Sequence, residues 1–353
     1  MSTYLIVDLS NMAHRMLHGT QGTIDIKAGM ALHITLNALR SSWRKFKADH
    51  IVVCLEGKSW RYELYPQYKA QRKVLASTQT KKEREDNEFF FGTFDIFVNF
   101  LRERTNTTVL QCEVAEADDM IARWIQLHPD DDHIIISSDR DFFQLLAPNV
   151  KMYDGIRNWT IGLDGYFEDN GKPVVVKRNK KRKDKTSGKM ITESTEIAME
   201  APDPEYALFV KIVRGDASDN VMSAYPGVRE HGSAKKPGIR EAFEDRNARG
   251  FNWNNFMLQE WDKLIGSDEE GNPETKRVRV IDEFNFNKKL VDLTEQPYEV
   301  KNAMDFAIAD AVSKERKSMV GIWFLRFTEE MALINIGKSP NEYAAMLAAP
   351  YAA

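Results

Sequence analysis

Short apolar strands alternate with helical segments over the first 150 residues, and this order limits the folds open to the chain. Helical apolar spacing recurs between or after strand-like runs at residues 4–8, 50–56, 107–113 and 132–138. Strands that alternate with helices form parallel sheets, because each helix carries the chain back across a face of the sheet. The sequence therefore predicts an α/β fold with a mostly parallel central sheet flanked by helices.

The pattern changes after Asn149. Residues 150–178 are typical of strand pairs joined by Gly and Asn turns, and a helix closed by Gly215 follows. The chain from there to about residue 315 is helical and loop-rich in character. We expect three regions, namely a core over 1–200, a helical region over 201–315 and a tail of open role over 316–353.

Composition and the N-terminal residues limit the location of the protein. No apolar run of the 353 residues reaches the roughly 18–20 needed to cross a membrane. The opening "MSTYLIVDLS" has no basic segment before its apolar stretch, unlike a signal peptide. Cys54 and Cys112 lie in apolar strand-like runs, which favours buried free thiols over a disulfide. We expect a cytoplasmic protein without a membrane partner.

The charges are segregated along the chain, although the net charge is only −4. Nine Lys or Arg and a single acid, Asp184, lie between residues 172 and 189. A second basic set occurs in "RSSWRKFKA" and "YKAQRK", and the acids cluster elsewhere. Such segregation can bring a phosphate chain to an acidic site, provided that cations mask the acids.

Carboxylates follow the expected strands or begin the helices after them. They are Asp8, Glu56, Glu116, Asp118, Asp119, Asp139, Asp141, Asp216 and Asp219. Ligands of open parallel sheets bind at the carboxyl ends of strands, so these side chains have a plausible common focus. The last two, in "GDASDN", are three apart, and a helical turn would point both the same way.

Each acid taken singly has an ordinary structural explanation. Asp and Glu stabilise helix N-termini as caps and through the helix dipole, and Asp also forms Asx turns. A shared focus without cations would be strongly destabilising, so the set as a whole favours a hard, oxygen-binding cation. Mg²⁺ fits, with Mn²⁺ as a substitute, and the scarcity of nearby His and Cys argues against Zn²⁺.

Five motifs in order resemble the 5′-nuclease superfamily, also called the flap endonuclease family, and within it the phage ribonuclease H and 5′→3′ exonuclease enzymes. The motifs are "IVDLSN", "CLEGKSWRYELYPQYKAQRK", "EADD", "SSDRDFFQLL" and "VRGDASDN". The resemblance spans roughly residues 3–230, and more loosely reaches about 310. It implies a PIN-like nuclease core with a helical arch at about 73–105, a basic insertion at about 172–189 and a C-terminal helical DNA-binding region.

The resemblance also implies roles for the acids. Those matching the ligands of the catalytic metal ions are Asp8, Glu116, Asp118 and Asp139. Those matching the second metal position are Asp141, Asp216 and Asp219. Asp119 matches an acid that acts near the first site through water. Glu56 stands where the family usually has Asp, and its longer side chain shifts the reach of the carboxylate.

Basic residues are assigned in the same way. Lys69 and Arg72 match residues at the base of the arch that contact the phosphate being cut. A Gly-rich hairpin that grips duplex phosphates usually follows the last motif; here "YPGV" is present, but "REHGSAK" interrupts the glycine pattern. Lys235, Lys236 and Gly238 are expected to contact DNA there. The run Lys180, Lys181, Arg182 and Lys183 is either a solvated loop or a second duplex contact.

The resemblance predicts a Mg²⁺-dependent, structure-specific 5′-nuclease that uses two metal ions. Its partners would be DNA with a 5′ flap or 5′ end, an RNA–DNA hybrid, and replication proteins such as a single-strand binding protein, polymerase or clamp bound through the tail. A phage-encoded member would act in the host cytoplasm. One alternative is a PIN-like endoribonuclease, although those domains are usually much shorter. The other is a nucleic-acid binding module with a degenerate metal site, against which the retained acids argue.

Overall fold

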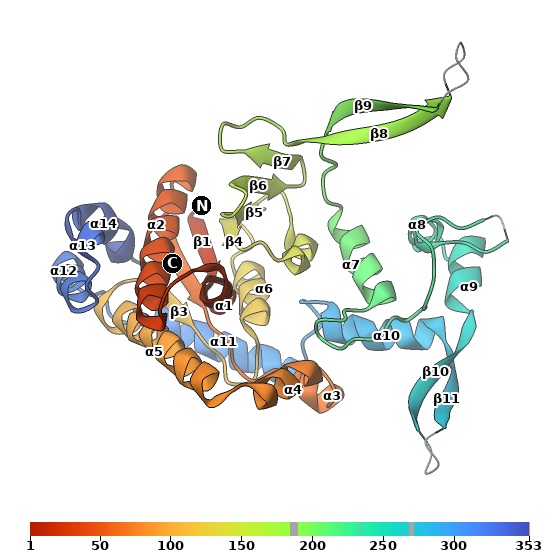
Figure 1. Ribbon diagram of the computed structural model, residues 1–353, viewed down its shortest axis with the longest axis horizontal. Coiled ribbons are helices and arrows are strands. Elements are labelled where there is room, and N and C mark those ends of the chain that lie inside the picture. Colours follow the sequence, from red (N-terminus) through yellow and green to blue (C-terminus); the bar gives the residue numbers. More distant parts are fainter. Residues whose placement is uncertain (184–189, 234, 268–271, 353) are drawn as a thin grey trace.

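A seven-stranded sheet forms the centre of the molecule (Figure 1). The computed structural model describes residues 1–183, 190–233, 235–267 and 272–352, and gives the backbone alone at 180–183, 190–193 and 267. The strands, in spatial order, are β3 (Thr108–Leu110), β2 (His50–Cys54), β1 (Thr3–Asp8), β4 (Asp132–Ile136), β5 (Val150–Asp154), β6 (Trp159–Gly162) and β7 (Gly165–Glu168). The first five run parallel and the last two antiparallel, which confirms the predicted mostly parallel sheet.

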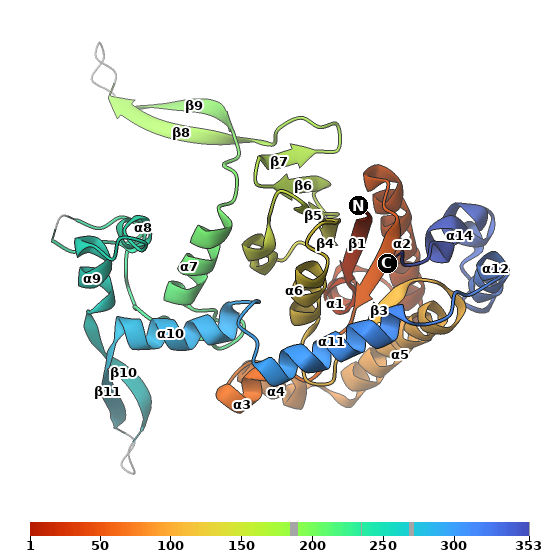
Figure 2. The same cartoon turned by 180° about the vertical axis from the view of Figure 1, so that it is seen from behind.

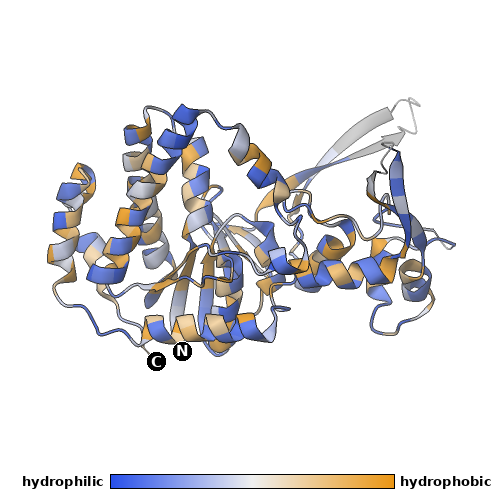
Figure 3. Ribbon diagram, turned by 90° about the horizontal axis from the view of Figure 1, so that it is seen from below, coloured by the Kyte–Doolittle hydropathy of each residue, from blue (hydrophilic) through white to orange (hydrophobic). Residues whose placement is uncertain are grey.

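Helices cover both faces of the sheet because alternate residues of each strand point to opposite sides. Leu5 and Val7 of β1 pack on one face, together with apolar residues from α1 (Leu9–Gly19), α2 (Ile24–Phe46) and α5 (Lys81–Arg104). Tyr4 and Ile6 pack on the other, with residues from α6 (Ala117–Leu127) and α11 (Tyr298–Val312). Figure 3 shows apolar residues gathered along the strands and on the helix faces beside them.

The strand order reverses beside β1. The chain adds β2 and β3 on one side of β1 and then crosses to add β4 and β5 on the other. Asp8 ends β1 opposite Cys54, and Val7 lies opposite Ile136 at the end of β4. The carboxyl ends of these strands therefore share one edge at a topological switch point, where open α/β sheets bind their ligands.

The predicted arch corresponds to two helices. The first is α4 (Ala70–Thr78), which has no buried residue. The second, α5, begins with a capping box: Glu83 N–H donates to Thr80 Oγ1 at 3.2 Å, and Thr80 N–H donates to Glu83 Oε2 at 2.8 Å. From Phe90 onward one face of α5 is buried in the core, so only its early turns lie outside. Most aromatics of this segment therefore serve packing.

A helical lobe lies beside the core (Figure 1). Its helices are α7 (Pro204–Arg214), α8 (Ile239–Glu244), α9 (Phe251–Met257) and α10 (Val280–Val291), packed around Phe209, Phe256 and Phe284. A hairpin of β10 (Glu260–Ser267) and β11 (Pro273–Arg279) extends from it, so the expectation of helices and loops throughout 201–315 was wrong there. Both strands are largely exposed and lack the apolar alternation that would have revealed them. Moreover, α11 packs on the core sheet rather than in the lobe.

The described part of the basic insertion, residues 172–183, contributes one strand to a two-stranded ribbon. Antiparallel strands β8 (Val175–Lys183) and β9 (Met190–Ala198) pair over their full length. Figures 1 and 2 show the ribbon extending away from the core, on the same side as the helical lobe.

The tail folds onto the core. Helices α12 (Val320–Glu330), α13 (Ile334–Gly337) and α14 (Asn341–Ala348) contribute to the same apolar cluster as α2 and α5. The rings of Phe100 and Phe327 stack with centroids 4.3 Å apart. Asn106 N–H donates to Leu347 O at 2.8 Å, which ties the end of the chain to the start of β3.

Two further expectations concern the thiols and membranes. Cys54 and Cys112 are both buried and unpaired, as predicted. Among the described residues, no helix combines the length and apolar character that a bilayer crossing requires.

Candidate active site

A cleft of about 1100 Å³ opens at the carboxyl edge of the sheet. Most of the predicted acids line it, namely Asp8, Glu56, Glu116, Asp118, Asp139, Asp141 and Asp219. Lys69 and Arg72 line the same cleft. These seven carboxylates and the two basic side chains therefore share one cleft.

Three of these acids are fixed by helix N-termini. Asp8 Oδ1 accepts the Asn11 N–H at 2.9 Å where α1 begins. Asp139 Oδ1 accepts the Asp141 N–H at 3.0 Å at the start of the 3₁₀ helix η1 (Arg140–Leu145). Glu56 Oε2 accepts the Ala117 N–H at 3.1 Å at the start of α6. Each carboxylate thereby has one oxygen held by backbone, while its other oxygen carries no described hydrogen bond.

The electrostatics of the cleft favour added positive charge. Burial, together with the neighbouring Glu56 and Asp139 charges, raises the pKa of Asp8 from 3.8 to about 7. Burial and the Asp8 charge raise the pKa of Asp118 well above its usual value. Raised carboxyl pKa values mean that the ionised forms lack sufficient counter-charge, which a divalent cation would supply.

Lys69 and Arg72 reach the acids from the start of the arch. Lys69, immediately before α4, has a left-handed backbone with φ 51°. Its Nζ contacts a Glu116 carboxylate oxygen and lies 3.9 Å from Asp219 Oδ1. Arg72 Nη2 lies 3.0 Å from the same Asp219 oxygen. Burial alone would raise the pKa of Glu116, but the cations of Lys69 and Arg61 lower it.

Asp119 does not itself line the cleft, and its predicted role near the first metal position through water stays a prediction. It is completely buried and forms a two-point ion pair with Arg61, the first residue of α3 (Arg61–Leu64). The Arg61 Nη1–Asp119 Oδ2 distance is 2.7 Å, and the Nη2–Oδ1 distance is 2.9 Å. Arg61 Nη1 also donates to Glu116 Oε2 at 3.0 Å. Asp119 therefore holds Glu116 in two ways, through Arg61 and directly, because the Glu116 N–H donates to Asp119 Oδ2 at 3.2 Å.

Asp216 and Asp219 do not share a helical turn, so that prediction was wrong. Ser218 N–H donates to Asp216 Oδ1 at 2.8 Å, which is an Asx turn. Asp216 faces Lys211 of α7, with Nζ 3.0 Å from Oδ2, while Asp219 faces Lys69 and Arg72. Lys211 also contacts Asp141, so it joins two acids assigned to the second metal position. Burial opposes the effect, but the Ser218 and Lys211 contacts lower the pKa of Asp216 to about 2.

The residues present fit a divalent cation, although they are not preassembled around one. Within the described ranges, no three His, Cys, Asp or Glu side chains form a ready group of ligands. Cationic side chains of the protein instead lie among the carboxylate oxygens. Each contacts an acid of the cleft: Lys69 contacts Glu116, Arg72 contacts Asp219 and Lys211 contacts Asp141. The donors are all carboxylates, the ligand type that Mg²⁺ and Mn²⁺ prefer.

Lys211, Arg61 and Tyr68 were missed by the sequence reasoning. The Tyr68 hydroxyl lies 3.1 Å from Glu116 Oε2 and 3.0 Å from Asp219 Oδ2. A usable signal existed for Lys211, because a lysine in the last turn of a helix that leads into "GDASDN" is near those acids. Arg61 gave no such signal, since its partner lies 58 residues away.

The predicted duplex-contact residues lie apart from the cleft. Gly238 begins α8, and its N–H donates to Glu241 Oε2 at 2.8 Å, while the Gly232 N–H donates to the same oxygen at 3.0 Å. A Cβ on Gly232 would lie 2.2 Å from Gly238 N, so the two backbone segments pack as closely as glycines permit. Lys235 and Lys236 are exposed in this turn. The side chains of Lys180, Lys181, Arg182 and Lys183 lie outside the described residues.

Fold and cleft together define an α/β protein with carboxylates gathered at the switch point of its sheet. Residues 3–171 match the family model described as "5'-3' exonuclease, N-terminal resolvase-like domain". This match confirms the resemblance to the 5′-nuclease superfamily over residues 3–171.

Two curated relatives and one solved structure agree with this domain match. A flap endonuclease Xni from Psychromonas ingrahamii is 29% identical over 44% of this chain and 58% of its own length. One from Shewanella loihica is 27% identical over 51% and 64%. The chain thus spans less than two thirds of either relative. A bacteriophage T5 flap endonuclease, crystallised as a pseudo-enzyme-product complex with DNA and metal ions, shares the fold at 18% identity. Its TM-score is 0.54, covering 88% of this chain and all of that one.

Proposed function

We propose that this protein is a Mg²⁺-dependent, structure-specific 5′-nuclease that hydrolyses phosphodiester bonds near 5′ ends of DNA or RNA–DNA hybrids. The observation that carries the proposal is the convergence of carboxylates with Lys69 and Arg72 in one cleft at the sheet's switch point. Two flap endonucleases among its relatives support the same reading.

The acids would hold two ions in this proposal, and Mn²⁺ would substitute for Mg²⁺. The first set is Asp8, Glu116, Asp118 and Asp139, and the second is Asp141, Asp216 and Asp219, with Glu56 at the rim. Bound ions would supply an activated water and stabilise the leaving oxygen. Lys69 and Arg72 would bind the phosphoryl oxygens as charge develops on them. Arg61, fixed by Asp119, orients Glu116, and no covalent intermediate is required.

The substrate would approach along the basic surfaces. The positive ribbon β8–β9 and the turn containing Lys235, Lys236 and Gly238 would bind the duplex, which positions the strand without reading its sequence. The complex of the bacteriophage T5 flap endonuclease with DNA supports DNA as the class of substrate. We further propose that replication proteins bind the outer face of the tail, and that the protein acts in the cytoplasm, that of the host if it is phage-encoded.

The test compares a 5′-labelled flap DNA, an RNA–DNA hybrid and an RNA hairpin, each with Mg²⁺ and with EDTA. We expect the flap and the hybrid to be cut near their 5′ ends in Mg²⁺ only. Cleavage of the hairpin alone would indicate a PIN-like endoribonuclease, and binding without any cleavage would indicate a degenerate site.

Asp139→Asn provides the matched control for chemistry. The variant should bind flap DNA as well as the wild type, or better, because it removes negative charge near the phosphate, yet it should not cut. Residual cleavage near the wild-type rate would exclude Asp139 from the ion-binding set.

A further inference from the structure

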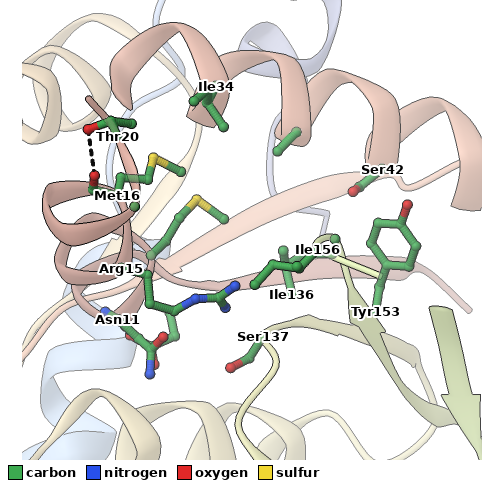
Figure 4. A pocket seen from close by; sticks show the side chains of 15 residues that line it. Asn11, Arg15, Met16, Thr20, Ile34, Ser42, Ile136, Ser137, Tyr153 and Ile156 are labelled. Carbon is green, nitrogen blue, oxygen red and sulfur yellow. Dashed lines mark hydrogen bonds between the residues drawn. The ribbon is translucent and has the colours of Figure 1, made fainter. Parts of the chain in front are cut away.

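A second cavity adjoins the acid cleft. It has a volume of about 300 Å³ and lies between α1, α2 and the ends of β4 and β5 (Figure 4). That volume is at the lower end of the roughly 300–1,000 Å³ of small-molecule sites. The two hollows share Asp8, Asn11 and Arg15 as lining residues, so a ligand in one would border the other.

The cavity wall is mostly apolar. Met12, Met16 and Ile136 form much of it, and the side chains of Ile34 and Ile156 remain 42% and 65% exposed beside it. Apolar side chains that stay exposed beside a charged cleft need an explanation, since nothing in the described part of the fold covers them. Flat apolar surfaces and methionine sulfur both make favourable contacts with aromatic rings.

One polar group in the wall has no partner. Ser42 is 1% exposed, and its hydroxyl makes no hydrogen bond in the structure. Figure 4 shows this hydroxyl directed into the cavity from α2. A buried hydroxyl without a partner is costly, and a ligand with a hydrogen-bonding edge would satisfy it.

Arg15 stands at the boundary between the two hollows. Its Nη1 donates to Ser138 Oγ at 2.7 Å, next to Asp139 in the chain. Figure 4 shows the guanidinium extended toward Ile136 and Ser137. A guanidinium in this place can stack on a planar ring or neutralise a phosphate passing from one hollow to the other.

We propose that this cavity binds the unstacked nucleobase of a nucleotide that adjoins the phosphate being cut. The proposal rests on the nuclease function above and assigns a base site to the same cleft. Enzymes that do chemistry on a base take it out of the stack and bind it between apolar side chains, with hydrogen bonds to its edge. The wall of this cavity offers the same two kinds of contact. A nucleobase is planar and has polar groups at its edge. It would contact the apolar side chains of the cavity wall with its faces and the Ser42 hydroxyl with its edge.

The test uses single-turnover cleavage of flap DNA in Mg²⁺, with an abasic site placed on either side of the cut phosphate. Ala38→Phe on α2 fills the cavity without altering a residue of the acid cleft. Ser41→Phe, on the same helix at an exposed position, is the control. We expect one abasic substrate, and Ala38→Phe on the normal substrate, each to lose roughly ten-fold in rate. When Ala38→Phe cuts the abasic substrate, its rate should be no lower than with either change alone, because both changes remove the same contact. Ser41→Phe should cut both substrates at the wild-type rate.

Other results would overturn the base site. They are a wild-type enzyme indifferent to both abasic substrates, an Ala38→Phe variant that keeps its full rate, or losses that multiply. Should the wild type cut no substrate, the nuclease proposal fails instead. Binding of DNA with 2-aminopurine at the same position then decides the base site: an emission change in the wild type that Ala38→Phe abolishes supports it, and identical emission overturns it.

Ser42→Ala keeps the proposal testable if Ala38→Phe does not fold. Its melting temperature should stay equal or rise, because the hydroxyl it removes has no partner in the free protein. Its cleavage rate should nevertheless fall by about five-fold on a natural base and not at all on a non-polar isostere. Equal rates of Ser42→Ala and wild type on the natural base would count against the site.

Discussion

At the scale of single residues, Lys69 and Arg72 contact carboxylates of the cleft in the structure and would contact phosphate oxygens in the proposed reaction. Lys69 contacts Glu116 and approaches Asp219, while Arg72 pairs with Asp219 alone. The Lys69 side chain is only 10% exposed, whereas that of Arg72 is 58% exposed. A buried donor keeps its position when charge develops beside it, so the two residues should differ in catalytic weight.

Lys69→Ala should therefore reduce single-turnover cleavage by on the order of 10²–10³, the typical loss for one preorganised donor. Arg72→Ala should lose less, because solvent already screens its charge. Neither should weaken DNA binding to the same degree, since transition-state charge exists only during turnover. The measurement is rate and dissociation constant across a salt series for both variants.

The contrast for this pair is the run Lys180–Lys183. Neutralising it should weaken binding and flatten the salt dependence, with the rate at saturating DNA unchanged. A Lys69→Ala variant that loses only affinity would place Lys69 in a binding surface.

Asp8 links the acids to pH. Its folded-state pKa of about 7 exceeds the ordinary 3.8, so between about pH 4 and pH 7 the folded protein without metal holds a proton that the unfolded chain has lost. Stability of the metal-free protein should fall as pH rises through this window, because the folded state binds more protons. A metal ion that binds the Asp8 carboxylate must displace this proton.

We therefore expect the rise in melting temperature caused by Mg²⁺ to be larger at pH 8 than at pH 6. Calorimetric titration should detect proton release on Mg²⁺ binding at pH 6 and less at pH 8. An increase in melting temperature that is the same at both pH values would contradict the assignment of Asp8 to a cation.

The sequence was informative about which residues gather, and less so about how they are held. Asp8, Glu56 and Asp139 follow strand ends, and strand ends of a parallel sheet must meet, so their convergence was predictable. Asp119 and Asp216 look the same in sequence, yet their orientation depends on Arg61 and Lys211. Those partners come from other elements, and no local pattern specifies which oxygen a guanidinium will occupy.

At the scale of elements, α4 is the least anchored helix among those beside the cleft. It has nine residues and none is buried, with Val74 and Leu75 more than 60% exposed. Helices this short are marginal in water unless they pack against something. Since Leu75 lines the cleft, we expect a nucleic-acid strand bound there to pack against α4.

Amide hydrogens of α4 should exchange far faster than those of the buried helix α6 in the free protein. Flap DNA bound in Ca²⁺ should slow exchange in α4 and leave α6 unchanged. Mass spectrometry of deuterated peptides measures both helices in one sample. Protection of α4 equal to that of α6 before DNA is added would show that it is already fixed.

Elements with a buried face were predictable, and those without one were not. β1 is buried on both faces and is apparent as a continuous apolar run. β8 begins within the strand pairs expected over residues 150–178, but the basic run Lys180–Lys183 gave no reason to expect the strand to continue. Its ladder with β9 is formed by backbone hydrogen bonds, which side-chain patterns do not record.

At the scale of the whole molecule, helices α12 to α14 of the tail complete the apolar cluster on one face of the sheet. Residues from α12 to α14 pack against α2 and α5, so the tail serves the fold on its inner side. Only its outward residues remain for a partner. Sequence reasoning could not foresee this, because an amphipathic tail does not say which face of the sheet it will cover.

Phe324→Ala should lower the free energy of unfolding by about 3–5 kcal/mol, the usual cost of emptying a buried Phe site. Phe324 is fully buried against α5 and α14, whereas Phe306, which is 77% exposed on α11, is the matched control. Phe306→Ala should change stability by less than about 0.5 kcal/mol. Urea denaturation of both variants checks this, and equal losses would show that the tail is not part of the core.

Synthesis order gives the cleft one more property. The Tyr68 hydroxyl reaches Asp219 across 151 residues of sequence, and α12 to α14 complete the apolar cluster that includes α2 and α5. A ribosome adds about 5–20 residues per second, so tens of seconds separate the emergence of the first acid from that of the last. A nascent chain displays the early carboxylates without the lysines and packing that organise them. We therefore expect the acid cleft to be organised only after α12 to α14 have been synthesised.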